Sequence, residues 1–264
     1  MTYPGGPAPH QSEAAPTGTR SPIGDGPAYA ASYESLTFPF LTRARRELSV
    51  TLAAQPVFDL IAERAVSRRV RRIIRHKGGE RGLLGRRTLE PADLRRIDLQ
   101  TLGHGLDLLR LGAEDSGVLP AFWRTAATSH GRFALLYAGL QHHSAPAMLL
   151  LEIMSGPEVA GVEALAEAIG HLQTERLNVI LHIAPDADLI AGMGGTGAHC
   201  LAVDFAGVDQ TGPRGWEEAT RLIAAARQAA AQVLILNLRP ESGPAAAAAG
   251  ATHAVFAPME NLTV

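Results

Sequence analysis

The chain has 264 residues, 46% hydrophobic and 19% charged, which is enough to bury the core of one large domain or two small ones. The formal net charge of -2 gives no general attraction to nucleic acid or to an anionic membrane. The single cysteine excludes an intrachain disulfide framework or a cysteine-rich zinc site, and no apolar run approaches the roughly 20 residues of a membrane span.

The N-terminal part of the chain is predicted to be poor in regular structure. Residues 1–30 are rich in Pro, Gly, Ser and Ala, so we expect a disordered tail there and one folded domain over 31–264. YESLTFPFLTRARREL is interpreted as a short helical or irregular lead-in. A pair of strands then follows in LSVTLAAQPVFDL and AVSRRVRRII, a helix in EPADLRRIDLQTLGHGLDLLRL, and a further strand in RFALLYAGL (132–140).

The C-terminal half alternates between apolar runs and helical patterns. Buried strands are predicted in AMLLLEIM (147–154), LNVILHIA (177–184), CLAVDFA (200–206), QVLILNL (232–238) and HAVFA (253–257), with helices between them. Strands that are apolar on both faces and alternate with helices are typical of a parallel sheet covered by helices. About eight strands in about 230 residues predict a β/α barrel, whereas no Gly-rich fingerprint supports the alternative, a doubly wound open sheet.

Arginines gather in the second predicted strand. Alternate residues of a strand share a face, so Arg69, Arg71 and Arg75 point one way, and Arg68 and Arg72 point the other. Arginine suits phosphate recognition, but a solvated edge with one or two internal ion pairs is the simpler interpretation. Because no aromatic residues are interleaved with the arginines, nucleic-acid binding is not expected.

One carboxylate, Glu152, interrupts the apolar run LLLEIM. A buried acid needs a metal, a cation or hydrogen-bond donors around it. The first hypothesis is a surviving metal or ligand contact at the mouth of a barrel. The second, which we favour, is an ion pair with a barrel arginine such as Arg69 or Arg71.

Other polar residues have plainer interpretations. Asp204 is expected to end a strand and hold the next loop, although a ligand contact is the alternative. His182 is expected to be a structural hydrogen-bonding residue, and His142-His143 a pair in a loop. Cys200 lies in an apolar setting and is expected to be a buried packing residue, as suits a reducing cytoplasm.

Two short motifs resemble a known family. QPVFDL (55–60) resembles the QPIVDL signature of EAL domains, the barrel-type cyclic di-GMP phosphodiesterases, and LLLEI (149–153) resembles their LVLEIT. CLAVD stands where that family has LKID, and VLILNL where it has VVAEG, so the similarity covers roughly residues 45–260. The resemblance implies a TIM-like (β/α)8 barrel of the EAL type in a bacterial cytoplasmic signalling protein.

The family's functional positions mostly carry other residues here. EAL enzymes hold two divalent cations with carboxylates and an asparagine, and a lysine helps to position the water. The resemblance places these groups at Arg69, about Ala138, His182, Ile183, Ala202 and near Asn237, and only Glu152 and Asp204 keep the residue type. Two carboxylates cannot hold two cations ~4 Å apart, so we expect no metal site, no cofactor and no catalytic residues.

Our leading hypothesis is therefore a catalytically inactive EAL-like domain that acts as a regulatory or protein-interaction module, as a monomer or a homodimer, with an unidentified protein partner. The alternative is a non-hydrolysing cyclic di-GMP receptor, in which Gln55, Arg69, Arg71, Glu152 and Asp204 are the candidate ligand-binding residues. An active phosphodiesterase is the weakest hypothesis on the count of metal ligands.

Overall fold

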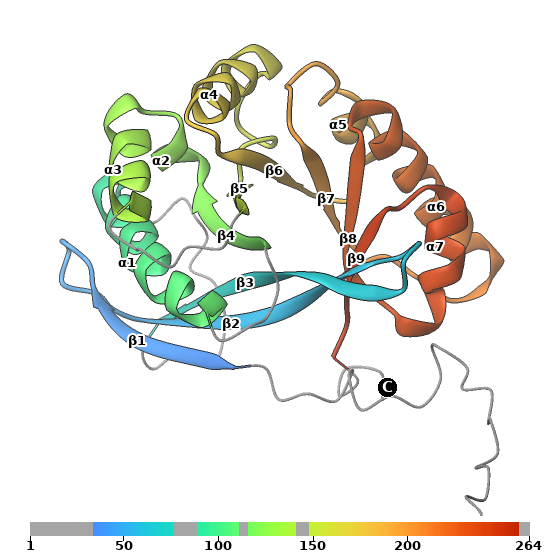
Figure 1. Cartoon of the computed structure of the whole chain (residues 1–264), viewed down its shortest axis with the longest axis horizontal. Helices are drawn as coiled ribbons and strands as arrows, with labels where there is room; N and C mark the ends of the chain where they lie inside the picture. The colour runs from blue at the N-terminus through green and yellow to red at the C-terminus, as the bar shows by residue number, and fades with distance from the viewer. Residues whose placement is uncertain (1–33, 77–88, 111–115, 141–147, 259–264) are drawn as a thin grey trace, which may run out of the picture.

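The computed structural model describes residues 34–76, 89–110, 116–140 and 148–258, with the side chains of 138–140 excepted. The expected tail and the pair His142-His143 lie outside these residues. Figure 1 shows one barrel-like body, with strands at its centre and helices around the outside. In the described part of the chain, no helix combines the length and the apolar character that a membrane crossing requires.

Eight strands close into a barrel in the order of the sequence. β2 runs antiparallel to its neighbours β3 and β9, and all the other neighbouring pairs are parallel. This mixed barrel confirms the predicted α/β barrel. The strands are β2 (Glu47–Asp59), β3 (Arg64–His76), β4 (Ser116–Phe122), β5 (Met148–Met154), β6 (Asn178–Ile183), β7 (Cys200–Asp204), β8 (Gln232–Leu238) and β9 (His253–Phe256).

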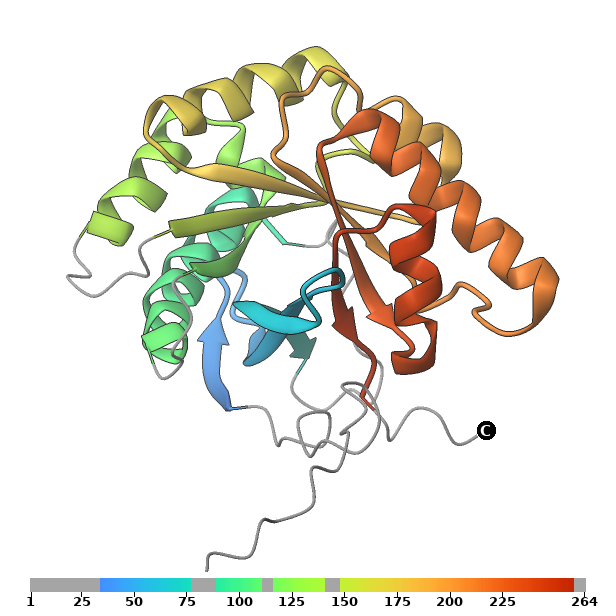
Figure 2. The same ribbon diagram turned by 45° about the vertical axis from the view of Figure 1, so that its right-hand side comes forward.

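Helices connect the parallel strands and cover the outside of the barrel (Figures 1 and 2). The buried apolar side chains of the helices meet the outward-facing side chains of the strands, such as Leu151 and Ile153. The helices are α1 (Pro91–Arg110), α2 (Trp123–Ala126), α3 (Ser129–Leu140), α4 (Val162–Thr174), α5 (Ala187–Ala191), α6 (Gly212–Ala229) and α7 (Gly243–Ala249), with a 3-10 turn at Pro240–Ser242.

An additional strand, β1 (Ser35–Leu41), lies outside the barrel and pairs antiparallel with β2. We expected a helical or irregular lead-in here, and this expectation was wrong. Phe38 and Phe40 alternate with exposed Thr37 and Pro39, so the segment has the period of a half-buried strand. β1 forms a three-stranded ribbon with the first half of β2 (47–53) and the second half of β3 (70–76). Helix α1 packs on one face of this ribbon.

The strand expected over 132–140 is also wrong, because these residues belong to helix α3. Phe133 and Tyr137 are exposed, whereas Leu135 is buried, which is a helical rather than an alternating pattern. The strand that occupies this place in the barrel is β4, which the sequence did not suggest because it contains Gly117 and Pro120.

The core has two parts. The larger part lies between the strands and the surrounding helices, and the smaller one fills the interior of the barrel. The interior side chains come from alternate positions of neighbouring strands, as in Leu150, Ile180, Cys200 and Ala202. Toward the carboxyl ends of the parallel strands, the same inward positions become polar, and these residues form the mouth of the barrel.

Candidate functional site

The polar residues at the mouth follow from strand periodicity. Glu152 lies two positions after the interior Leu150, His182 two after Ile180, and Asp204 two after Ala202, so all three side chains point inward. β2 runs the other way and contributes Gln55, which is the direct cross-strand neighbour of Arg69 on β3. Side chains from five strands therefore meet in one layer.

Arg69 and Glu152 form the centre of this layer. Arg69 Nε donates to Glu152 Oε2 and Arg69 Nη2 donates to Glu152 Oε1, both at 2.7 Å, which is a bidentate ion pair. His182 Nδ1 lies 2.7 Å from Glu152 Oε1, and Arg69 Nη1 donates to Gln55 Oε1 at 3.0 Å. The Glu152 side chain has no exposed surface, so the pair links β2, β3, β5 and β6 inside the barrel.

The charge state of Glu152 follows from these contacts. Burial alone would raise its pKa, but the positive charge of Arg69 and the hydrogen bonds from His182 and Arg69 outweigh burial and lower the pKa well below its ordinary value. Glu152 is therefore an ionised carboxylate. Because an ionised carboxylate only accepts, the proton between the two residues sits on His182 Nδ1, which donates to Glu152.

A second buried ion pair joins the ribbon to helix α1. Arg72 Nη1 donates to Asp98 Oδ1 at 2.6 Å and to Thr101 Oγ1 at 3.2 Å, and the Asp98 carboxylate also accepts the backbone N–H of Phe122. The guanidinium carbon of Arg72 lies 3.9 Å from the centre of the Phe122 ring. Arg72 Nη2 has no hydrogen-bond partner among the described residues, and the aromatic face partly compensates it.

Asp204 ends β7 in a local network. Its Oδ1 accepts from Asn237 Nδ2 at 2.6 Å and from the backbone N–H of Ala206 at 2.9 Å. Asn237 adopts a left-handed conformation with φ of 57°, which the short polar side chain tolerates. These contacts agree with the expectation that Asp204 closes its strand and holds the next loop.

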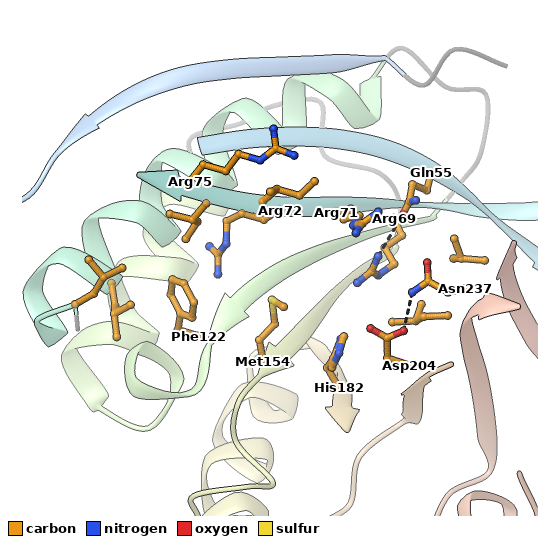
Figure 3. A pocket seen from close by; sticks show the side chains of 16 residues that line it. Gln55, Arg69, Arg71, Arg72, Arg75, Phe122, Met154, His182, Asp204 and Asn237 are labelled. Carbon is orange, nitrogen blue, oxygen red and sulfur yellow. Dashed lines mark hydrogen bonds between the residues drawn. The ribbon is translucent and has the colours of Figure 1, made fainter. Parts of the chain in front are cut away.

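A cavity of about 320 Å³ opens above this layer (Figure 3). Phe122, Met154 and Leu236 supply apolar surface, and the polar lining consists of Gln55, Arg69, Arg71, Arg72, Arg75, His182, Asp204 and Asn237. Burial and the like charge of Arg69 lower the pKa of Arg71, whereas Asp204 acts in the opposite direction. The arrangement can bind an anionic group through the arginine side chains of its lining.

The structure brings together all five residues that the sequence suggested for ligand binding. Gln55, Arg69, Arg71 and Asp204 line the cavity, and Glu152 lies beneath it, within salt-bridge distance of Arg69 as predicted. The position near Ala138 lies on α3 rather than at the end of a barrel strand, so the expected asparagine equivalent was misplaced.

Sequence reasoning missed the partner of Arg72. Asp98 is one of a few acids on the buried side of α1, close to Ile97 and Thr101. An acid on the apolar stripe of a predicted helix requires a buried cation, and that signal was available from the sequence. In the ranges that the structure covers, no three His, Cys, Asp or Glu side chains lie close enough together to hold a metal ion.

Comparison with known proteins finds similarity at the level of structure. No protein-family model matches the sequence, and no curated protein sequence matches it. The phosphodiesterase PaMucR, solved as a cyclic di-GMP complex, superposes with a TM-score of 0.59 and 13% identity over 80% of this chain and 98% of that chain.

Two further solved structures give the same result. The EAL domain of Xanthomonas citri FimX, in complex with cyclic di-GMP, has a TM-score of 0.58 and 11% identity over 78% of this chain and 85% of that chain. A standalone EAL protein from Vibrio cholerae, in its cyclic di-GMP-bound form, has a TM-score of 0.57 and 11% identity over 78% and 88% of the two chains. The chain therefore has an EAL-type fold.

Proposed function

We propose that this EAL-type barrel does not hydrolyse cyclic di-GMP and that it acts as a regulatory or protein-interaction module. The observation that carries the proposal is the bidentate pair between Arg69 and Glu152. Both carboxylate oxygens of Glu152 are occupied by a guanidinium, and one of them also by His182. The carboxylate at the centre of the barrel is therefore neutralised by a protein cation.

The residues at the mouth do not fit two divalent cations. Two-metal cleavage of a phosphodiester requires several hard oxygen ligands around a pair of ions ~4 Å apart. Here the Arg69 guanidinium lies beside Glu152, and Asp204 is engaged with Asn237 and Ala206. Placing a cation against Glu152 would first require the loss of a buried ion pair, which is strongly unfavourable.

The second candidate function is a non-hydrolysing cyclic di-GMP receptor. The cavity at the mouth carries Arg71 in its lining, and arginine matches phosphate oxygens in a planar, bidentate manner. The PaMucR and FimX structures are cyclic di-GMP complexes of the same fold. We place both candidates in a bacterial cytoplasm, and we propose a protein partner, with a homodimer as the alternative assembly.

One pair of measurements distinguishes the interaction module, the cyclic di-GMP receptor and the hydrolase. Purified protein is titrated with cyclic di-GMP by calorimetry, with and without Mg²⁺ or Mn²⁺, and the linear product is followed chromatographically. The PaMucR phosphodiesterase domain serves as the active control. Product formation above that of a reaction without protein would overturn the proposal. Saturable binding without product would select the receptor, and neither signal is the result expected for an interaction module.

A further inference from the structure

Among the arginines of β3, Arg71 and Arg75 take no part in the ion pairs that Arg68, Arg69 and Arg72 form. Arg69 and Arg72 are buried and paired with Glu152 and Asp98. Arg71 and Arg75 are exposed, and neither forms an ion pair or a hydrogen bond with a residue in the described part of the chain. The charge of Arg69 is therefore balanced inside the barrel, whereas Arg71 has the charge of Asp204 near it but no ion pair with a described residue, and Arg75 likewise has no ion pair with one.

These two arginines lie on the face of the three-stranded ribbon that is turned away from α1, which we call the ribbon face. Strand pairing places Arg71 beside Ala53, Ile73 beside Thr51, and Arg75 beside Ser49. The residues on β2 are small and half-buried, and the neighbouring Arg71, Ile73 and Arg75 also line the cavity at the mouth. The central positions of the ribbon face are Ser49, Thr51, Ala53, Arg71, Ile73 and Arg75.

The spacing on β3 limits what can satisfy both charges. Arg71 and Arg75 are four residues apart on one side of a strand, which separates their Cα atoms by ~13 Å at ~3.3 Å per residue. An extended segment has the same rise, so acids four residues apart can face both arginines. Four residues of a helix span only ~6 Å, so two acids one turn apart in a helix do not match this spacing.

Ile73 adds an apolar requirement between the two charges. It shares the face with Arg71 and Arg75, is half-buried, and also lines the cavity at the mouth. In a segment that lies along β3, the residue midway between the two acids would contact Ile73. The face therefore presents a positive charge at Arg71, an apolar side chain at Ile73 and a second positive charge at Arg75.

We propose that the ribbon face binds an extended acidic segment of a partner protein, with an acid at its first position, an apolar residue at its third and an acid at its fifth. This inference rests on the proposed function as an interaction module, and it names the chemistry of the partner. Charge complementarity to Arg71 and Arg75 provides the selectivity, and contact with Ile73 sets the register. Binding weakens as the salt concentration rises, because the paired groups are exposed before association.

The test uses the full chain and fluorescently labelled peptides in a polarisation titration. The probe is Ser-Glu-Thr-Val-Thr-Glu-Ser. A neutral control is Ser-Gln-Thr-Val-Thr-Gln-Ser, and a spacing control with the same net charge is Ser-Glu-Glu-Val-Thr-Thr-Ser. We expect saturable, salt-sensitive binding of the probe, with weaker binding of both controls.

Variants of the protein identify the surface. The double variant Arg71→Gln, Arg75→Gln should reduce the affinity for the probe about tenfold, since two exposed ion pairs are lost. The double variant Arg71→Lys, Arg75→Lys keeps the charges and should retain most of the binding. Arg221→Gln removes an exposed arginine on α6 and should leave the affinity unchanged. Urea unfolding midpoints show that each variant remains folded.

Two results would overturn the inference. One is a probe that binds no better than the neutral and spacing controls. The other is an affinity that the glutamine double variant does not reduce. Neither depends on the cyclic di-GMP assay, because the peptide titration contains no nucleotide and no metal ion. Hydrolysis of cyclic di-GMP would reject the proposed function whatever the peptides do, and peptide failure would reject only the ribbon-face partner.

Discussion

Arg69 and Glu152, 83 residues apart in the sequence, meet inside the barrel through two parallel N–H···O contacts of 2.7 Å. The Glu152 side chain has no exposed surface and that of Arg69 has 6%. Taking two charges out of water is costly, and the cost is offset only when each charge has its partner in good geometry. The intact pair consequently contributes little net free energy to folding, whereas the loss of one partner destabilises the folded state strongly.

Removing one member of this pair should destabilise the protein severely. Glu152→Gln leaves a buried guanidinium without its counter-ion, and we expect a loss of ~3–5 kcal/mol in the free energy of unfolding. Arg69→Met should cost a similar amount, since Glu152 would then be a buried, unpaired carboxylate. The double variant Arg69→Met, Glu152→Leu should cost much less than the sum. Urea titrations monitored by circular dichroism measure all three.

The matched control for this prediction is an exposed ion pair on helix α1. Arg110 Nη1 lies 3.2 Å from Asp107 Oδ1, and the two side chains are 38% and 58% exposed. Arg110→Gln should change the unfolding free energy by less than about 1 kcal/mol. If Glu152→Gln were as mild as this control, the buried pair would not hold the barrel together.

The same pair predicts a pH dependence. The folded-state pKa of Glu152 lies well below its ordinary value of about 4.5, so the stabilisation is fully present above that value. As the pH falls further, the unfolded chain takes up a proton that the folded chain does not, and stability decreases by up to about 1.4 kcal/mol per pH unit. The stability gap between the wild type and Glu152→Gln should therefore narrow from pH 6 to about pH 3. A gap that stays constant in acid would contradict this account.

Most of the barrel could be predicted because its signals are local. The apolar runs of β5 to β9 are bounded by helical patterns, and such alternation is typical of a parallel sheet. The two errors arose where tertiary context decides. An apolar run such as 132–140 is compatible with a helix or a strand. It forms the helix α3, in which only one side is buried. β4 was not predicted because Gly117 and Pro120 are uncommon inside strands. The strand forms nevertheless, because it pairs with β3 only at Gly117 and Val118, so that the missing N–H of Pro120 is tolerated.

The site could be predicted in part for a similar reason. A lone acid in an apolar strand signals that a cation must be near, and the arginines of β3 were the available cations. Choosing Arg69 over Arg71 required the register between β2, β3 and the parallel strands, which no sequence pattern contains. The role of His182 also depends on geometry, since its Nδ1 donates to Glu152 only because β5 and β6 are neighbours with Glu152 opposite Ile180.

Cys200 should be inert in the folded protein. It lies in the barrel interior, and burial raises the pKa of its thiol to about 12. A thiol-reactive maleimide dye should label it only when the barrel opens, so native protein should react slowly and protein in denaturant should take up one dye per chain. Cys200→Ser gives the background signal. Rapid labelling of the native protein would show that the interior at the base of the barrel is open to reagents.

Pro39 lies in the middle of β1, the strand at the outer edge of the ribbon. The backbone N–H of Ala54 donates to Glu34 and that of Thr42 to Arg46, so the even-numbered residues of β1 turn their polar groups toward β2. The odd-numbered residues, Ser35, Thr37, Pro39 and Leu41, turn theirs toward the outer edge, where no strand of the described residues pairs with β1. Proline has no N–H, and it therefore removes one donor from the centre of an edge that could otherwise pair with another chain.

Replacing this proline should promote self-association through the edge of β1. Pro39→Val restores the missing N–H at an exposed position and adds a β-branched side chain, so two copies could pair their β1 strands antiparallel. Analytical ultracentrifugation over a range of concentrations should show a larger association constant for Pro39→Val than for the wild type. Thr37→Val is the matched control, because it adds the same side chain at an edge position that already has its N–H. Equal behaviour of the two variants would assign the effect to hydrophobicity and would refute a protective role for Pro39.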